Sequence, residues 1–190
     1  ALSSAASDVY KRQNMKRTLF PGYSVGTDAY EDIKEICPAY GKKAAIIGGK
    51  HALAAAQDKI IAAAKEAGIE IIGPFWYGGE ASVENIEMLK PKVADADMIF
   101  AVGGGKAIDT CKVLSHSTDR PFFTFPTIAS TCASCTSLGI LYHPDGSLRE
   151  YSFSKIPPKH IFIDTGIIAD APDKYCLLYT SPSPRDRQKS

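Results

Sequence analysis

The chain has little of what marks membrane, secreted or nucleic-acid-binding proteins. Its 190 residues contain no run near the roughly 18 consecutive apolar residues that a membrane-spanning helix needs. Lys and Arg number 22 against 21 Asp and Glu, for a net charge of +1, so no basic excess indicates a nucleic-acid partner. The hydrophobic content of 45% is ordinary for a globular domain. We expect a cytoplasmic protein with no membrane and no nucleic acid as partner.

Cysteine is also scarce, and disulfide-rich secreted folds are therefore excluded. Four of the five cysteines lie before Tyr175 and fit reduced thiols in a cytosolic protein: Cys37, Cys111, Cys132 and Cys135. The Cys132-x-x-Cys135 spacing is also typical of a redox pair or half a zinc site, but no second ligand pair accompanies it. The four histidines are isolated from one another, so we expect no metal site in this chain.

The two ends of the chain are related as DNA rather than as protein. Residues 8–13 can be coded by a string whose reverse complement, read from its second base, encodes residues 176–181. Unrelated protein segments have no reason to be inverted copies of one DNA sequence. We therefore expect residues 1–13 and 176–190 to be translated adapters from transposase-based library preparation, and set them aside. The alternative for the C-terminal segment is an ordinary disordered tail rich in Ser, Pro and Arg.

Strand-like and helix-like segments alternate along the remaining chain. The patterns predict strands at 42–48, 69–72, 97–102, 121–125 and 160–164, and helices at 51–67, from 82 to about 94, and at 106–117. This alternation predicts an α/β fold, a Rossmann-like parallel sheet with helices on both faces. A turn signal at 143–146 adds a β-hairpin of 138–142 with 148–153. Residues 165–172 are expected to form a linker into a second domain.

A glycine-rich turn follows the strand that ends at Val102. Gly103, Gly104 and Gly105 allow a tight turn whose N–H groups can approach a ligand, and Lys106 adds a cation. The positive end of the following helix would favour a phosphate at the same place. Such a turn alone is also compatible with a plain strand-to-helix connection. Asp109 is expected to be a residue of the helix start rather than a ligand.

Two further motifs follow strands of the same predicted sheet. Gly48-Gly49-Lys50 follows the first strand, and residues 127–131 follow the fourth. Ligands of open α/β sheets bind beyond the carboxyl ends of the strands. Three motifs at one edge therefore predict a nucleotide crevice.

The order and spacing of these motifs resemble the iron-containing alcohol dehydrogenase superfamily, and within it the glycerol dehydrogenase branch. The matching segments are 20–23, 77–82, 99–110, 126–131, 137–142 and 163–172. The resemblance spans essentially all of 14–175. It implies an NAD(P)-binding N-terminal domain at 14–165, followed by an all-helical metal domain. Only the start of that domain, 166–175, is expected here, and the rest is missing.

The resemblance also implies roles for residues of the cofactor site. Gly105 and Lys106 would contact the pyrophosphate, with Gly103 and Gly104 in the same turn. The adenosine side would be held by Thr127 and Ser130, with Thr131 beside them. The nicotinamide-ribose region would be lined by Thr136, Leu138 and Tyr142.

Two positions depart from the pattern of the branch. Members that prefer NAD carry an acidic residue that binds the adenine ribose, whereas this chain has Gly49 there, followed by Lys50. Both NAD and NADP therefore remain open, and Lys50 can equally be a residue of a surface turn. Glycerol dehydrogenases carry an Asp in contact with the polyol where this chain has Cys132. Cys132 is thus a candidate substrate residue that would favour a hydroxycarboxylate, or else a side chain packed under the nicotinamide.

The predicted function is the cofactor-binding part of a metal-dependent NAD(P) oxidoreductase acting on a small polyol, alcohol or hydroxy acid. Zn²⁺ or Fe²⁺ is expected only in the full-length protein, whose ligands, an Asp and two His, would lie in the missing domain. The fragment alone is expected to be inactive, and a homo-oligomer of the full-length form is compatible with the resemblance. The alternatives are a glycerol-1-phosphate dehydrogenase or dehydroquinate-synthase-like enzyme, a non-catalytic nucleotide-binding module, and a thiol-redox role for Cys132 and Cys135.

Overall fold

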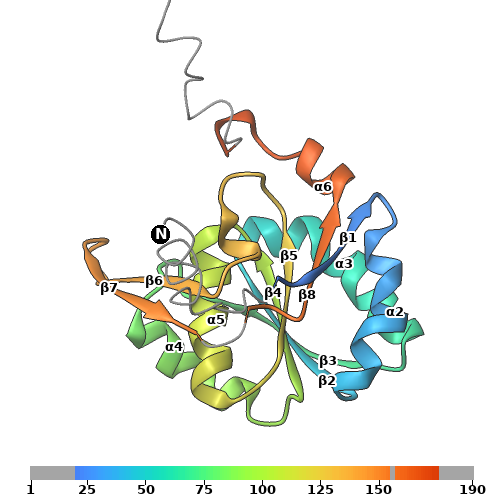
Figure 1. Cartoon of the computed structure of the whole chain (residues 1–190), viewed down its shortest axis with the longest axis horizontal. Coiled ribbons are helices and arrows are strands. Elements are labelled where there is room, and N and C mark those ends of the chain that lie inside the picture. Colours follow the sequence, from blue (N-terminus) through green and yellow to red (C-terminus); the bar gives the residue numbers. More distant parts are fainter. Residues whose placement is uncertain (1–19, 155–156, 176–190) are drawn as a thin grey trace, which may run out of the picture.

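The computed structural model describes residues 20–154 and 157–175, which form a six-stranded parallel sheet with helices on both faces (Figure 1). The segments expected to be adapters, 1–13 and 176–190, lie outside these residues. The strand order is β1-β8-β5-β4-β2-β3. The strands are β1 (Gly22–Gly26), β2 (Lys43–Gly48), β3 (Glu70–Trp76), β4 (Met98–Gly103), β5 (Phe122–Pro126) and β8 (His160–Asp164). This sheet confirms the predicted α/β class.

Alternate residues of the central strands contribute to two separate hydrophobic cores, one on each face of the sheet. On one face, Phe100 and Phe125 pack against α3 (Lys50–Glu66) and the short α2 (Ile33–Ile36). On the other face, Ile99 and Ala101 pack against α4 (Val83–Leu89) and α5 (Gly105–Thr118). All six residues of β4 are buried, as expected of a parallel strand covered on both sides.

Two predicted boundaries were wrong, each because of a proline. β3 runs on to Trp76 through Pro74, which the sheet tolerates because β3 is an edge strand and Pro74 needs no ladder partner there. The helix after Ser82 was expected to reach about Ala94, but α4 ends at Leu89 and a 3₁₀ helix, Lys90–Val93, follows. Pro91 supplies no N–H for the α-helical ladder, which explains the change.

The segment before β2 was not predicted as regular structure. It forms β1, a 3₁₀ helix (Ala29–Asp32), α2 and a second 3₁₀ helix (Cys37–Tyr40). β1 pairs only with β8, in parallel and with Gly22 opposite His160. Its partner lies far along the chain, so no local pattern indicates the pairing.

The C-terminal part contains one confirmed element and one correction. β6 (Leu138–Tyr142) and β7 (Leu148–Phe153) form the predicted antiparallel hairpin as a separate two-stranded sheet. Residues 165–172, expected to be a linker, instead begin with a short helix, α6 (Thr165–Ala169). The buried Asp164 carboxylate starts this helix by accepting hydrogen bonds from the N–H groups of Gly166 and Ile167. None of the described helices is long and apolar enough to cross a membrane.

Candidate nucleotide-binding site

A groove of about 1130 Å³ lies at the carboxyl ends of β2, β4 and β5. The turns that follow these three strands line one side of it, and residues between Ile167 and Tyr175 line another. Seven of the predicted cofactor residues meet in this groove: Gly49, Lys50, Gly103, Gly104, Gly105, Lys106 and Thr127. The tertiary structure therefore joins the three sequence motifs in a single concave surface.

The other predicted cofactor residues lie outside the lining of this groove. Ser130 and Thr131 belong to the loop after β5, and the Thr131 hydroxyl accepts a hydrogen bond from Ala133 N–H at 3.3 Å. Thr136 and Leu138 are neighbours of the Lys112 ammonium. The Tyr142 ring centroid lies 5.8 Å from Lys106 Nζ, at the side of the glycine-rich turn. The contacts of Ser130 and Thr131 with the adenosine side stay a prediction. So do those of Thr136, Leu138 and Tyr142 with the nicotinamide ribose.

The two long helices that begin at the groove have glycine N-caps. Gly49 precedes α3 and Gly104 precedes α5, and neither helix has a side-chain hydrogen bond to its first turn. Ser82 caps α4 and Asp164 caps α6 with side-chain oxygens instead. The first N–H groups of α3 and α5 are therefore left for water or a ligand, and the helix dipoles make an anion the favoured ligand.

One glycine of the turn after β4 is required by its backbone conformation, and a second packs closely against a side chain. Gly103 has φ +141°, a conformation that L side chains rarely adopt. A Cβ on Gly104 would lie 2.6 Å from Ile128 Cδ1. A larger residue at Gly104 would therefore require the Ile128 side chain to move. At Gly49 a Cβ would meet only ordinary contacts, at 3.6 Å or more.

Two lysines line the groove, one in the first turn of α3 and one in the first turn of α5. Lys50 Nζ lies 4.6 Å from the centroid of the Trp76 ring, which is 45% exposed at the groove. Lys106 Nζ donates a hydrogen bond to Glu80 Oε2 at 2.6 Å, and this bond is the main cause that raises the pKa of Lys106. Both cations therefore lie at a surface suited to anions, Lys50 against an aromatic ring and Lys106 in an ion pair.

Asp109 does not lie at the start of its helix as expected. It is the fifth residue of α5, it is buried, and its carboxylate pairs with Lys112 Nζ at 2.9 Å. Burial raises the pKa of Asp109, and the charge of Lys112 partly offsets that effect. The pair is part of the core between α5 and the hairpin, so Asp109 has a structural role rather than a binding one.

Cys132 is exposed in a 3₁₀ helix, Cys132–Ser134, next to the loop after β5. Its carbonyl accepts hydrogen bonds from the N–H and the thiol of Cys135, at 3.1 and 3.2 Å. No group of three His, Cys, Asp or Glu side chains in the described residues is arranged to hold a metal ion. The metal that the resemblance implies therefore has no ligand set in this part of the chain.

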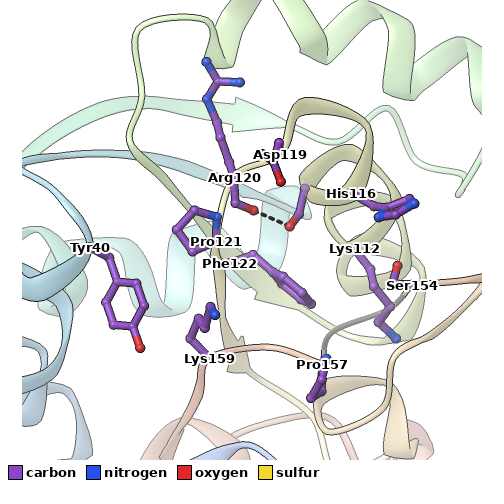
Figure 2. Close-up of a pocket in the computed structure, with 11 residues that line it drawn as sticks. Tyr40, Lys112, His116, Asp119, Arg120, Pro121, Phe122, Ser154, Pro157 and Lys159 are labelled. Carbon is purple, nitrogen blue, oxygen red and sulfur yellow. Dashed lines mark hydrogen bonds between the residues drawn. The ribbon is translucent and has the colours of Figure 1, made fainter. Parts of the chain in front are cut away.

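A second cavity, of about 530 Å³, lies at the amino end of β5 (Figure 2). Arg120 contributes to it, but its guanidinium donates to the carbonyls of Ala94, Ala96 and Thr118. The C-terminal turn of α5, with His116 and Asp119, also lines this cavity. A helix C-terminus disfavours anions, and none of the sequence motifs lies here, so we assign the candidate site to the groove.

Sequence reasoning missed several side chains of the groove. Trp76 and Tyr77 line it from the end of β3, and Ile167, Asp170 and Tyr175 line it from the far side. Residues 77–82 carried part of the family resemblance, which was a usable signal for Tyr77. The resemblance predicts that residues 166–175 begin the next domain, and only the tertiary structure places several of them at the groove.

An open parallel sheet with a groove at the carboxyl ends of its strands is typical of nucleotide-binding α/β proteins. A family model described as iron-containing alcohol dehydrogenase matches residues 21–165. The chain belongs to this family.

Relatives and a solved structure agree with this assignment. The glycerol dehydrogenase of Escherichia coli O6:H1 is 35% identical over 156 residues, 80% of this chain and 42% of that protein. Hydroxycarboxylate dehydrogenase A of Escherichia coli K12 is 33% identical over 136 residues, 71% of this chain and 37% of that protein. The crystal structure of glycerol dehydrogenase from Schizosaccharomyces pombe matches with a TM-score of 0.73 and 31% identity, covering 82% of this chain and 40% of that chain. The chain thus spans less than half the length of these relatives.

Proposed function

We propose that this chain is the dinucleotide-binding part of a metal-dependent NAD(P) oxidoreductase that acts on a small polyol or hydroxycarboxylate. The observation that carries the proposal is the meeting of two glycine-capped helix N-termini, those of α3 and α5, in one groove. A dinucleotide has phosphates and riboses spaced along an extended molecule, and such a groove suits it. The names of the relatives support the reaction class.

The adenosine end of the groove favours NADP over NAD. The α3 N-terminus lacks a side-chain cap, and Lys50 stands in its first turn. Gly49 occupies the place where a carboxylate would bind ribose hydroxyls and repel a 2′-phosphate. Lys50 rests against Trp76 through a cation–π contact, which is weak enough for a phosphate to replace.

The part of the proposal that concerns the substrate rests on Cys132. Its thiol is exposed where glycerol dehydrogenases would present a carboxylate, so an anionic hydroxycarboxylate would not meet a carboxylate charge there. Because the described residues hold no ligand set for a metal, we derive no catalytic step from them. We expect the chain alone to bind nucleotide without transferring hydride.

The proposal is tested by calorimetric titration of the 190-residue chain with NADPH and with NADH. We expect saturable binding that Lys106→Met weakens about ten- to a hundredfold, because a charge-assisted hydrogen bond to phosphate is lost. Lys65→Met removes an equal charge from the exposed surface of α3 and serves as the matched control. Absence of saturable binding of either nucleotide at millimolar concentration would refute the proposal.

A further inference from the structure

Glu80 brings a negative charge to the glycine-rich turn. It lies in the loop between β3 and α4, and its Oε2 accepts the hydrogen bond from Lys106 Nζ at 2.6 Å. The Glu80 side chain is only 17% exposed, whereas that of Lys106 is 55% exposed. Lys106 lines the groove and Glu80 does not. The ammonium is thus the member of the pair that a ligand can reach more easily, and it is held at the edge of the proposed phosphate site.

The loop that carries Glu80 is held by several hydrogen bonds, one of them to the Glu80 carboxylate. Glu80 Oε1 accepts one from Ala81 N–H at 3.1 Å, and the Glu80 carbonyl accepts one from Asn85 Nδ2 at 2.8 Å. The carbonyl of Ala81 accepts another from Tyr142 N–H on β6, at 2.8 Å. The backbone of the loop at Glu80 and Ala81 is therefore tied both to α4 and to the hairpin, and one further hydrogen bond, from Ala81 N–H, holds the carboxylate itself.

We infer that Glu80 and a phosphate group of the ligand compete for the Lys106 ammonium, so that Glu80 weakens anion binding at the glycine-rich turn. The inference rests on the proposed function for the identity of the anion as a dinucleotide pyrophosphate. It makes Glu80 an affinity-setting residue that acts through Lys106.

The direction of the effect follows from the charges. If Lys106 stays on Glu80, its positive charge is already neutralised when the phosphate arrives. If Lys106 turns to the phosphate, Glu80 loses its partner while remaining largely shielded from water, which is unfavourable. Either route lowers the affinity for an anion, and removal of the Glu80 charge raises it.

The test is calorimetric titration of the full chain with inorganic pyrophosphate, and in parallel with NADPH, for wild type and Glu80→Gln. The glutamine keeps the shape and the acceptor oxygen for Ala81 N–H but not the charge. We expect the pyrophosphate Kd to fall about two- to fivefold, the scale of a solvent-accessible ion pair. Glu87→Gln is the matched control, since it removes one carboxylate from α4 that pairs with Lys90 and not with Lys106. Its Kd should equal that of wild type.

An unchanged or weaker pyrophosphate affinity in Glu80→Gln overturns the inference, as does an equal gain in Glu87→Gln. If circular dichroism shows Glu80→Gln unfolded, Glu80→Ala replaces it, because alanine also removes the charge and the same direction is expected. If Glu80→Gln binds pyrophosphate more tightly than wild type but neither protein binds NADPH, the competition is supported and the proposed function is refuted. If NADPH binds but Glu80→Gln changes the affinity for neither ligand, the proposed function is supported and the competition is refuted. If neither wild type nor the variants bind pyrophosphate, the inference is overturned.

Discussion

Asp109 and Lys112 form an ion pair inside the protein, one turn apart on α5. Lys112 Nζ lies 2.9 Å from Asp109 Oδ1, and the lysine side chain is fully buried. The same ammonium donates to the carbonyl of Leu138 at 2.6 Å, and the other carboxylate oxygen accepts from Ile140 N–H at 3.3 Å. The pair therefore holds the hairpin strand β6 against the helix that begins at the glycine-rich turn.

Lys112→Met is expected to lower the free energy of unfolding by about 3 kcal/mol. The change keeps the apolar length of the side chain but leaves Asp109 buried without its partner. Urea unfolding monitored by circular dichroism measures the difference. The exposed Lys65→Met should change stability by no more than about 0.5 kcal/mol. A Lys112→Met protein as stable as the control would show that the pair contributes nothing.

Gly49→Asp is expected to reverse the choice of cofactor. A carboxylate at this position would accept hydrogen bonds from ribose hydroxyls and repel a 2′-phosphate. The ratio of NADPH to NADH affinity should fall at least about tenfold, which corresponds to about 1.4 kcal/mol. Titration with both nucleotides gives the ratio.

Gly49→Asn is the matched control for that change. Both Asp and Asn are good N-caps for α3, so both should raise stability slightly, by about a few tenths of a kcal/mol relative to Gly49. Only Asp brings the charge. An equal loss of NADPH preference in both variants would assign the effect to shape and contradict the electrostatic argument.

The cysteines are expected to fall into two classes of reactivity. Burial raises the pKa of Cys37 to about 12 and raises that of Cys111 further, so neither forms a thiolate at neutral pH in the folded protein. Cys132 is exposed. Iodoacetamide treatment followed by peptide mass spectrometry should label Cys132 in the native chain, and Cys37 and Cys111 only after addition of urea. Native labelling of Cys111 would contradict the burial of the α5 core.

The stability of the protein is expected to fall below pH 6.5 because of His160. Its Nε2 lies 2.9 Å from Ser24 Oγ, which also donates to Asp32. Burial lowers the pKa of His160, and the charge of Asp32 partly offsets this. The unfolded chain, with an ordinary histidine pKa of about 6.5, therefore takes up a proton first as the pH falls. The contribution of His160 to the free energy of unfolding is complete above pH about 6.5. It is lost as the pH falls to the lower pKa that His160 has in the folded protein.

Urea unfolding at pH 7.5 and pH 5.0 tests this dependence. His160→Gln should lose less stability between the two pH values than wild type, because it has no proton to take up. The exposed His51→Gln should follow wild type. If His160→Gln and wild type lose equal stability, the dependence comes from other groups.

Much of the fold could be predicted from local patterns. Buried runs between glycine and proline signals placed β2, β4, β5 and β8, and the turn at 143–146 placed the hairpin. The edge strand β1 could not be found in this way, because the five residues Gly22–Gly26 have no strong pattern and pair only with β8. Similarly, α6 depends on the Asp164 carboxylate, which also accepts a hydrogen bond from Lys59 at 2.8 Å.

The sequence by itself determined the alternation of strands and helices, and the glycines at the strand ends that leave helix N-termini open to an anion. Both depend on local periodicity and local backbone freedom. Only the tertiary structure decided that Glu80 meets Lys106 across 26 residues, that Lys112 is buried with Asp109, and that residues 167–175 line the groove. Such contacts depend on how the parallel strands are ordered in the sheet and on which face each connection covers. Strand order and the placement of the connections depend on packing throughout the core, so no short segment of the sequence predicts them.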